Sequence, residues 1–220
     1  MMTSASNQFA LESMYRDFVL MEEVNPSAKS SSSAASSFKI SGAPDSTEVL
    51  ELVFYLQESN SDQLEALLAE ISDPTSARYG QYMTKDEVDA LTANPDALVT
   101  TQAFLDSLQA GGVTYQKTSD SVITATGPVS TWEKALNTQF MQYSAADNDN
   151  PSQHQTSGTT AAKTIVRTDK YSLPTAVAPY VSAIFNTVQF PVTVRSGPII
   201  SLQEEGGSVS GHHHHQHAQT

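Results

Sequence analysis

Residues 73–82 read DPTSARYGQY, and this stretch decides the fold because one helix should end before it and another begin after it. The preceding segment, Ser61–Ile71, spaces its apolar residues i, i+3, i+4, i+7, as an amphipathic helix does: Leu64, Leu67, Leu68 and Ile71. Pro74 lacks a backbone donor, so that helix ends there. Thr84 and Glu87 have the spacing of a capping box, which predicts a short second helix. The loop is therefore held at both ends.

Patterning elsewhere predicts a buried central strand, a longer helix, a hairpin, another helix and a fourth strand. These are Val49–Gln57, Asp96–Gln109, Val113–Lys117 with Val122–Ala125, a helix from Pro128 through Leu136, and Gln139–Tyr143. Residues 145–163 are polar and expected to be mobile, and Ile165–Thr168 resumes an extended pattern. This order is typical of an α+β fold: a ferredoxin-like antiparallel sheet with helices on one face.

The composition divides the chain into three parts. Residues 1–45 form a Ser-rich extension that we expect to be mostly disordered, because Ser27–Ser37 is almost entirely Ser and Ala. Residues 46–192 form the ordered domain, and residues 193–220 form a linker with a His-rich tail. Phe9–Leu20 is compatible with a short amphipathic helix, but its charges interrupt the apolar run that a signal peptide needs. No transmembrane span is visible.

Charge and cysteine content narrow the class of partner. The 24 Asp and Glu outnumber the 11 Lys and Arg, giving a formal net charge of −13, which argues against nucleic acid as a partner. A partner with a basic face, or an acidic environment, suits the chain better. It contains no cysteine, which excludes disulfides and thiolate metal sites.

The pattern DP-x-S-x-x-YG-x-Y, followed by Thr and an acidic helix start, resembles the propeptide of the sedolisin family. These serine-carboxyl peptidases include kumamolisin and tripeptidyl-peptidase I. The likeness covers roughly residues 46–192 and continues through Gly127-Pro128 to the motif around Val188–Pro191. The residues that carry it are Asp73, Pro74, Ser76, Tyr79, Gly80, Tyr82, Arg167, Tyr171, Leu173, Pro174, Phe190 and Pro191.

The resemblance implies an activation domain that assists folding of its peptidase, blocks the substrate cleft and is removed by acid-triggered self-cleavage in the linker after Thr193. Its partner would be the cognate peptidase catalytic domain, with neither nucleic acid nor membrane involved, in a secreted or lysosomal/vacuolar precursor. Contacts with the peptidase are expected at Arg167–Pro174 and at a final strand ending at Pro191. The alternative is a free-standing ferredoxin-like module that binds another protein.

The chain itself is not expected to be an enzyme, to hold a metal or to bind a cofactor; the resemblance places calcium in the catalytic domain only. Ser157–Ala161 resembles the family's nucleophile motif SGTSA, but Thr160 stands where the nucleophilic Ser should be, so a flexible loop is the better interpretation. The His-rich run, His212–His215 with His217, could chelate a metal, but a tag or a low-complexity tail is favoured.

The remaining candidate residues favour structural interpretations. The adjacent acids Asp86-Glu87 and Glu204-Glu205 are expected to be solvated surface charge, because neighbouring side chains point in different directions. His154 stands alone in a polar loop. Three aromatic residues are expected to pack in the core or within the loop: Tyr79, Tyr82 and Trp132.

Overall fold

A computed structural model describes residues 15–24, 38–145 and 164–191. The described strands are β1 (Phe18–Glu23), β2 (Phe38–Gly42), β3 (Val49–Leu56), β4 (Thr114–Ser119), β5 (Val122–Pro128), β6 (Met141–Ala145), β7 (Thr164–Arg167), β8 (Lys170–Pro174) and β9 (Val181–Phe185). The helices are α3 (Ser61–Ser72), α4 (Lys85–Thr92), α5 (Pro95–Ser107) and α6 (Val129–Ala135), with short 3-10 helices η2 (Gln109–Gly111) and η3 (Ala178–Tyr180). All strand pairs are antiparallel.

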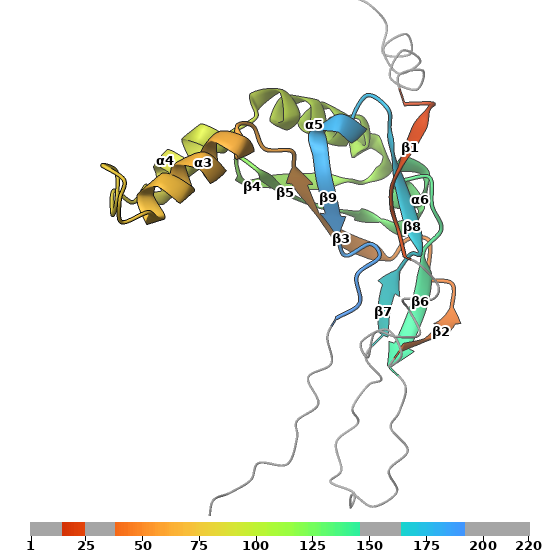
Figure 1. The fold of residues 1–220 in the computed structure, drawn as a ribbon. Helices are drawn as coiled ribbons and strands as arrows, with labels where there is room; N and C mark the ends of the chain where they lie inside the picture. The colour runs from red at the N-terminus through yellow and green to blue at the C-terminus, as the bar shows by residue number, and fades with distance from the viewer. Residues whose placement is uncertain (1–14, 25–37, 146–163, 192–220) are drawn as a thin grey trace, which may run out of the picture.

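The main sheet has the strand order β4-β5-β3-β9, with β3 and β5 in the centre (Figure 1). In chain order the sheet uses β3, then helices, then the β4–β5 hairpin, then α6, and last β9. This is the ferredoxin-like arrangement, so the predicted α+β class and its antiparallel sheet are confirmed. The predicted fourth strand at Gln139–Tyr143 forms as β6, but it belongs to another sheet, and β9 takes the fourth position instead.

The side chains of strand β3 alternate between the two faces of the sheet, one covered by helices and one uncovered. Leu52, Phe54 and Leu56 are buried, and the residues between them face outward, since successive side chains of a strand alternate. Behind Phe54 lies Trp132 of α6, with ring centroids 6.0 Å apart, and the indole Nε1–H donates to the carbonyl of Leu50 at 3.2 Å. Helices α5 and α6 thus cover one face of the sheet, as predicted.

The predicted helix ends agree closely with the structure. Thr84 caps α4: its Oγ accepts from the Glu87 amide, while the Glu87 carboxylate accepts from the Thr84 amide at 2.7 Å. Asn94 caps α5 by accepting from the Ala97 amide at 3.1 Å. At the start of α6, Gly127 is confined by packing, since an added Cβ would lie 2.6 Å from a methyl group of Val113.

Two strands lie within residues 1–45, which the sequence analysis expected to be mostly disordered. Strand β1 pairs with β8, and β2 pairs with β6 in a three-stranded sheet of order β2-β6-β7. Residues 18–23 and 38–42 are therefore ordered by pairing with strands far along the chain, which local composition does not reveal. Phe18 and Leu20, assigned above to a possible helix, are in β1.

In the described ranges, no helix combines the length and the apolar character needed to cross a membrane.

One buried hydroxyl, that of Thr101, has no hydrogen-bond partner among the described residues. Thr101 is fully buried on α5, on the same side as Ala97 and Leu105. An unsatisfied buried donor costs about 1–3 kcal/mol, and valine has the same shape without the hydroxyl. We therefore expect Thr101→Val to raise the free energy of unfolding by about 1 kcal/mol and the Tm by about 2–4 °C in calorimetry.

Thr92 provides the matched control for this substitution. It is also buried and helical, but its Oγ1 donates to the Val88 carbonyl at 3.0 Å. Thr92→Val should not stabilise the protein, because it removes a satisfied hydrogen bond. If both substitutions stabilised the protein equally, the missing hydrogen-bond partner of Thr101 would not be the cause of the stabilisation.

Candidate functional site

The face of the main sheet opposite α5 and α6, called here the open face, is a candidate docking surface. Strand register places its residues together, because directly paired residues share a face. It carries one formal charge, that of Glu51, in a chain of net charge −13. The open face consists of Val49, Glu51, Val53, Tyr55, Thr114, Gln116, Thr118, Thr124, Thr126, Ala183 and Phe185.

An aromatic pair marks one part of the open face. The rings of Tyr55 and Phe185 lie 4.9 Å apart, centroid to centroid, with 40% and 44% of these residues exposed. Val49, on the same strand as Tyr55, is 62% exposed. Beside them, hydroxyl and amide groups of β4 and β5 line a shallow hollow. Exposed aromatic residues with few charges are the composition of a protein–protein interface core.

Sequence reasoning missed this surface for two reasons. Val49–Gln57 was correctly predicted as the central strand but was treated as buried, although its alternation leaves Tyr55 outside. Phe185 was missed because Val181–Phe185 was not recognised as a strand. The signal was present in the β-prone run VSAIF, which begins two residues after Pro179.

Arg167 holds the segment that follows β9. Its Nε–H donates to the Gln189 carbonyl at 2.6 Å, and its two terminal nitrogens donate to the Val166 carbonyl at 2.7 Å and to Oδ1 of Asn186 at 3.4 Å. Asn186 in turn donates to the carbonyl of Glu51 at 3.1 Å. Burial lowers the pKa of the Arg167 guanidinium, and every group that it contacts here is a neutral oxygen. Arg167 therefore fixes the direction in which the chain leaves the sheet.

The other residues of the second half of the signature pack inside the domain. Tyr171 is buried and its hydroxyl accepts from the Ile184 amide at 2.9 Å, joining β8 to β9. Burial, together with the nearby Glu22 carboxylate, raises the pKa of Tyr171 to about 12. Leu173 and Pro174 are buried opposite β1. The expected peptidase contact at Arg167–Pro174 therefore does not hold for these three residues.

The end of the signature also packs internally. The Phe190 ring lies 5.0 Å from that of Tyr143 and 5.8 Å from that of Phe38, so it joins residue 190 to the three-stranded sheet. Pro191 is half-buried and lies outside any strand. The expected final strand ending at Pro191 is wrong, because the last described strand ends at Phe185.

Hydrogen bonds within the loop hold residues 73–82 in shape. Oδ1 of Asp73 accepts from the amide and the hydroxyl of Thr75, both at 2.8 Å, and these bonds lower the pKa of the Asp73 carboxyl. The Ser76 carbonyl accepts from the Tyr79 amide at 3.1 Å. Gly80, at φ +76°, donates to the Ile71 carbonyl at 3.0 Å and so closes the loop onto α3. Pro74 is exposed.

The tyrosines of this loop do not pack in the core. Tyr79 is 54% exposed and Tyr82 is 74% exposed, whereas Trp132 is fully buried. The expectation of core or loop packing is thus confirmed for Trp132, whereas the core is excluded for both tyrosines. The hydrogen bonds that hold the loop are made by its backbone and by Asp73, Thr75 and Ser76, so neither tyrosine side chain is needed for them.

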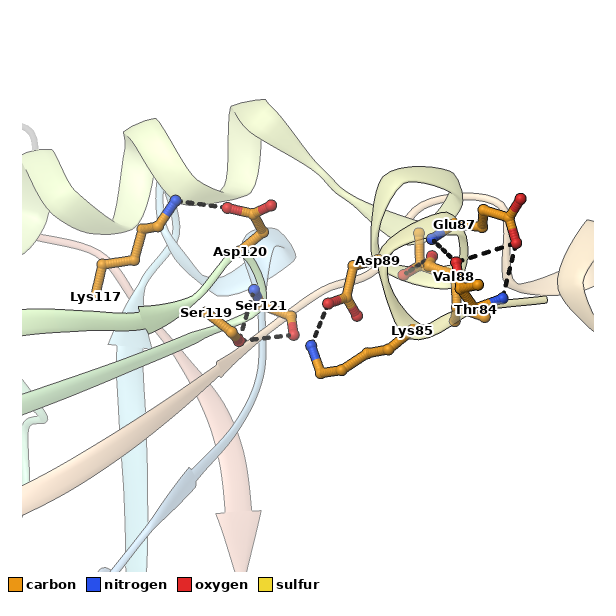
Figure 2. Close-up of polar contacts among 10 residues, drawn as sticks. Thr84, Lys85, Glu87, Val88, Asp89, Lys117, Ser119, Asp120 and Ser121 are labelled. Carbon is orange, nitrogen blue, oxygen red and sulfur yellow. Dashed lines mark hydrogen bonds and ion pairs between the residues drawn. The ribbon is translucent and has the colours of Figure 1, made fainter.

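Figure 2 shows the ion pairs where α4 approaches the β4–β5 turn. Lys85 pairs with Asp89 on α4, and Lys117 pairs with Asp120 at 2.5 Å across the turn. The charge of Lys85 also lowers the pKa of Asp120, after the larger effect of Lys117. All four side chains are at least two-fifths exposed, so these pairs contribute little to stability.

The described residues contain no group of three or more His, Asp or Glu that could hold a metal ion. Asp86 and Glu87 are exposed, and the Glu87 carboxylate is used in the helix cap. Several sequence candidates lie outside the described residues: His154, Ser157–Ala161 with Thr160, Glu204-Glu205, His212–His215 and His217.

Comparison with known proteins identifies relatives of this chain. The family described as "Pro-kumamolisin, activation domain" matches residues 36–190. Tripeptidyl-peptidase SED4 of Arthroderma otae is 31% identical over 152 residues, which are 68% of this chain and 23% of that protein. Physarolisin of Physarum polycephalum is 30% identical over 144 residues, which are 65% of this chain and 23% of that protein. Tripeptidyl-peptidase 1 of Homo sapiens is 32% identical over 153 residues, which are 69% of this chain and 25% of that protein. The chain spans about a quarter of the length of these curated relatives.

Replacing Arg167 tests its role at the chain exit. Lysine keeps the charge but cannot reproduce the planar fork of donors. We expect Arg167→Lys to lower the free energy of unfolding by about 1–3 kcal/mol, measured by urea denaturation. Amide exchange should also become faster at Thr168, whose N–H donates to the Thr187 carbonyl beside this network. Arg78→Lys is the control, because the exposed Arg78–Glu70 pair should change stability by less than about 0.5 kcal/mol.

The Asp73 turn predicts a specific dependence on pH. Folding lowers the pKa of the Asp73 carboxyl below the unfolded value, which is about 3.9 for Asp. The charged carboxyl therefore stabilises the native state at pH values above that unfolded pKa. This stabilisation is lost as the pH falls through the lower pKa of the folded state. NMR titration should therefore find the Asp73 midpoint below that of the unfolded chain. Thr75→Ala removes the hydroxyl donor and should move this midpoint upward.

Asp45 serves as the internal control in the same spectra. Its Oδ1 accepts from the amide and hydroxyl of Thr47 in the same way, and its pKa is likewise lowered. Thr75→Ala should leave the Asp45 midpoint unchanged. The backbone amide of residue 75, the largest cause of the lowered pKa, remains in that variant, so an unchanged Asp73 midpoint would contradict the contribution of the Thr75 hydroxyl.

Proposed function

The chain belongs to the pro-kumamolisin activation domain family, and from this premise we propose that it acts as the pro domain of a sedolisin-type serine-carboxyl peptidase precursor. In this role it assists folding of the peptidase catalytic domain, blocks the substrate cleft and is released by acid-triggered autoproteolysis. Relatives such as tripeptidyl-peptidase 1 and physarolisin are about four times as long as the matched region. The catalytic domain is therefore the proposed partner, and the chain itself is proposed to have no peptidase activity.

The observation that carries this proposal is the open face. A domain of this fold hides one side of its sheet beneath α5 and α6 and leaves the other side without a covering layer in the described structure (Figure 1). That side presents Tyr55 and Phe185 with almost no charge. Charged residues are costly to bury, so this is the part of the surface that a partner covers at the lowest desolvation cost.

The position at which the chain leaves the sheet also supports docking through the open face. Arg167 anchors residues 186–189 immediately after β9, whose Phe185 belongs to the open face. The segment that follows therefore starts beside the surface on which the peptidase would sit. A linker that begins there can be led toward the cleft of a docked catalytic domain.

Acid release is assigned to carboxylates outside the open face, since that face itself carries only the charge of Glu51. The chain carries 24 Asp and Glu, residue types whose unperturbed pKa values lie near 4, and a carboxylate paired with a cation across an interface loses that attraction when it is protonated. Docking should accordingly be tight near pH 7 and weak near pH 4. By the same family relation, we propose a secreted or lysosomal/vacuolar precursor, in which acidification triggers release.

Inhibition measurements test the proposal directly. The chain, added in trans, should inhibit the mature peptidase domain of human tripeptidyl-peptidase 1 or of physarolisin after preincubation near pH 7, and the inhibition should disappear near pH 4. The double variant Tyr55→Lys/Phe185→Lys should weaken inhibition at least about tenfold, equivalent to about 1.4 kcal/mol, because it places charge at the centre of the interface. The chain alone should cleave no peptide.

Val99→Lys is the matched control. Val99 is 65% exposed on α5, on the covered side of the sheet, so a lysine there should leave inhibition unchanged. Inhibition of neither peptidase at neutral pH, or equal loss with the Val99 variant, would refute docking through the open face.

A further inference from the structure

Helices α3 and α4 with the loop between them form an arm, residues 61–92, that projects away from the sheet (Figure 1). Two of its residues, Ile71 and Thr92, are buried. At its base, the Ser59 amide donates to the Thr92 carbonyl at 2.9 Å, and the Asn60 side chain donates to the Leu91 carbonyl at the same distance. The arm is thus tied to the domain at its base, while its tip contributes little to the core.

The tip presents Tyr79 and Tyr82 from a backbone that is held by hydrogen bonds of the loop itself. The Asp73 turn, the Ser76–Tyr79 bond and the Gly80–Ile71 bond hold the loop without help from either tyrosine side chain. Within the described part of the chain, neither tyrosine hydroxyl makes a hydrogen bond. Aromatic side chains on a preorganised loop lose little entropy on binding, which is how rigid recognition surfaces gain affinity.

The charge of the arm indicates the chemistry of the surface that would meet it. Its seven acidic residues outnumber two basic ones, for a formal charge of −5. Both basic residues are engaged within the arm, Arg78 with Glu70 and Lys85 with Asp89. A basic surface would complement these carboxylates, and its Arg or Lys side chains could also lie against the tyrosine rings. The acidic residues are Asp62, Glu65, Glu70, Asp73, Asp86, Glu87 and Asp89.

Strand directions place the arm at the opposite end of the sheet from the chain exit. The arm follows the end of β3, beside the β4–β5 turn and the start of β9, since the Gln57 amide donates to the Tyr180 carbonyl. The exit lies where β9 ends, next to the first half of β3. Helix α3, with 12 residues, extends the contact surface by about 18 Å.

We propose that the tip of the arm is a second docking element, in which Tyr79 and Tyr82 contact a basic region of the same peptidase domain that covers the open face. This inference rests on the proposed function. It assigns the signature loop two tasks: Asp73, Ser76 and Gly80 shape the loop, and the tyrosines bind the partner. Arm and exit together then fix the orientation of the peptidase along the strands.

The test compares tyrosine variants of the whole chain for inhibition near pH 7, using whichever of the two peptidase domains the wild-type chain inhibits. Tyr79→Ala/Tyr82→Ala should raise the inhibition constant at least tenfold while leaving the Tm unchanged, because both side chains are exposed. Val99→Ala, which removes a comparably exposed apolar side chain from the covered side, should change neither quantity.

A second variant tests the charge of the contact. Glu65→Gln/Asp86→Asn removes two exposed carboxylates of the arm that take part in neither ion pair. Its inhibition should depend less steeply on salt concentration than that of the wild type.

The outcomes separate the two proposals. If the wild-type chain inhibits and the tyrosine variant inhibits within twofold of it, the role of the arm is overturned. The open-face proposal then still stands. A chain that inhibits neither peptidase would overturn the proposed function and the arm contact with it. A tyrosine variant with a lowered Tm and unchanged inhibition would assign Tyr79 and Tyr82 to folding, which also overturns the docking role.

Discussion

The pairing of β3 with strands on both of its sides is the constraint on which the rest of this structure depends. Its alternating side chains send Leu52, Phe54 and Leu56 into the core and leave Tyr55 outside. Because β5 and β9 pair with it in fixed register, the same division continues across the whole sheet. The helices that bury the apolar side therefore create, by the same geometry, the uncovered side that we assign to the peptidase.

The signature residues divide by what they do in the folded chain. One group shapes the backbone: Asp73 closes a turn, Gly80 takes a positive φ, and Arg167 holds the segment after β9. A second group fills space, with Tyr171 and Leu173 buried between strands. Tyr79 and Tyr82 belong to neither group, since they are exposed and make no side-chain hydrogen bond in the described residues. The family signature thus combines residues that shape the fold with two that we propose for recognition.

Local signals predicted the helices and the hairpin well. The apolar spacing of Leu64, Leu67 and Ile71 and the Thr84–Glu87 box act within one or two turns of chain, so reading them requires no knowledge of the fold. Strands β1, β2, β8 and β9 escaped prediction, since each is stabilised by a partner far away in sequence. For β1 that partner is β8, about 150 residues later along the chain.

By itself, the sequence determined the four helices, the central strand with the hairpin beside it, the α+β class, the two ends of the DPTSARYGQY loop and the family resemblance, because these depend on short-range periodicity, capping and turn chemistry. Tertiary structure alone decided which strand is fourth in the sheet, that residues 18–23 and 38–42 are strands, and that Phe185 lies beside Tyr55. It also decided that Trp132 is buried while Tyr79 and Tyr82 are exposed. Burial is a property of what packs around a side chain, and for an aromatic residue the local sequence is compatible with both outcomes.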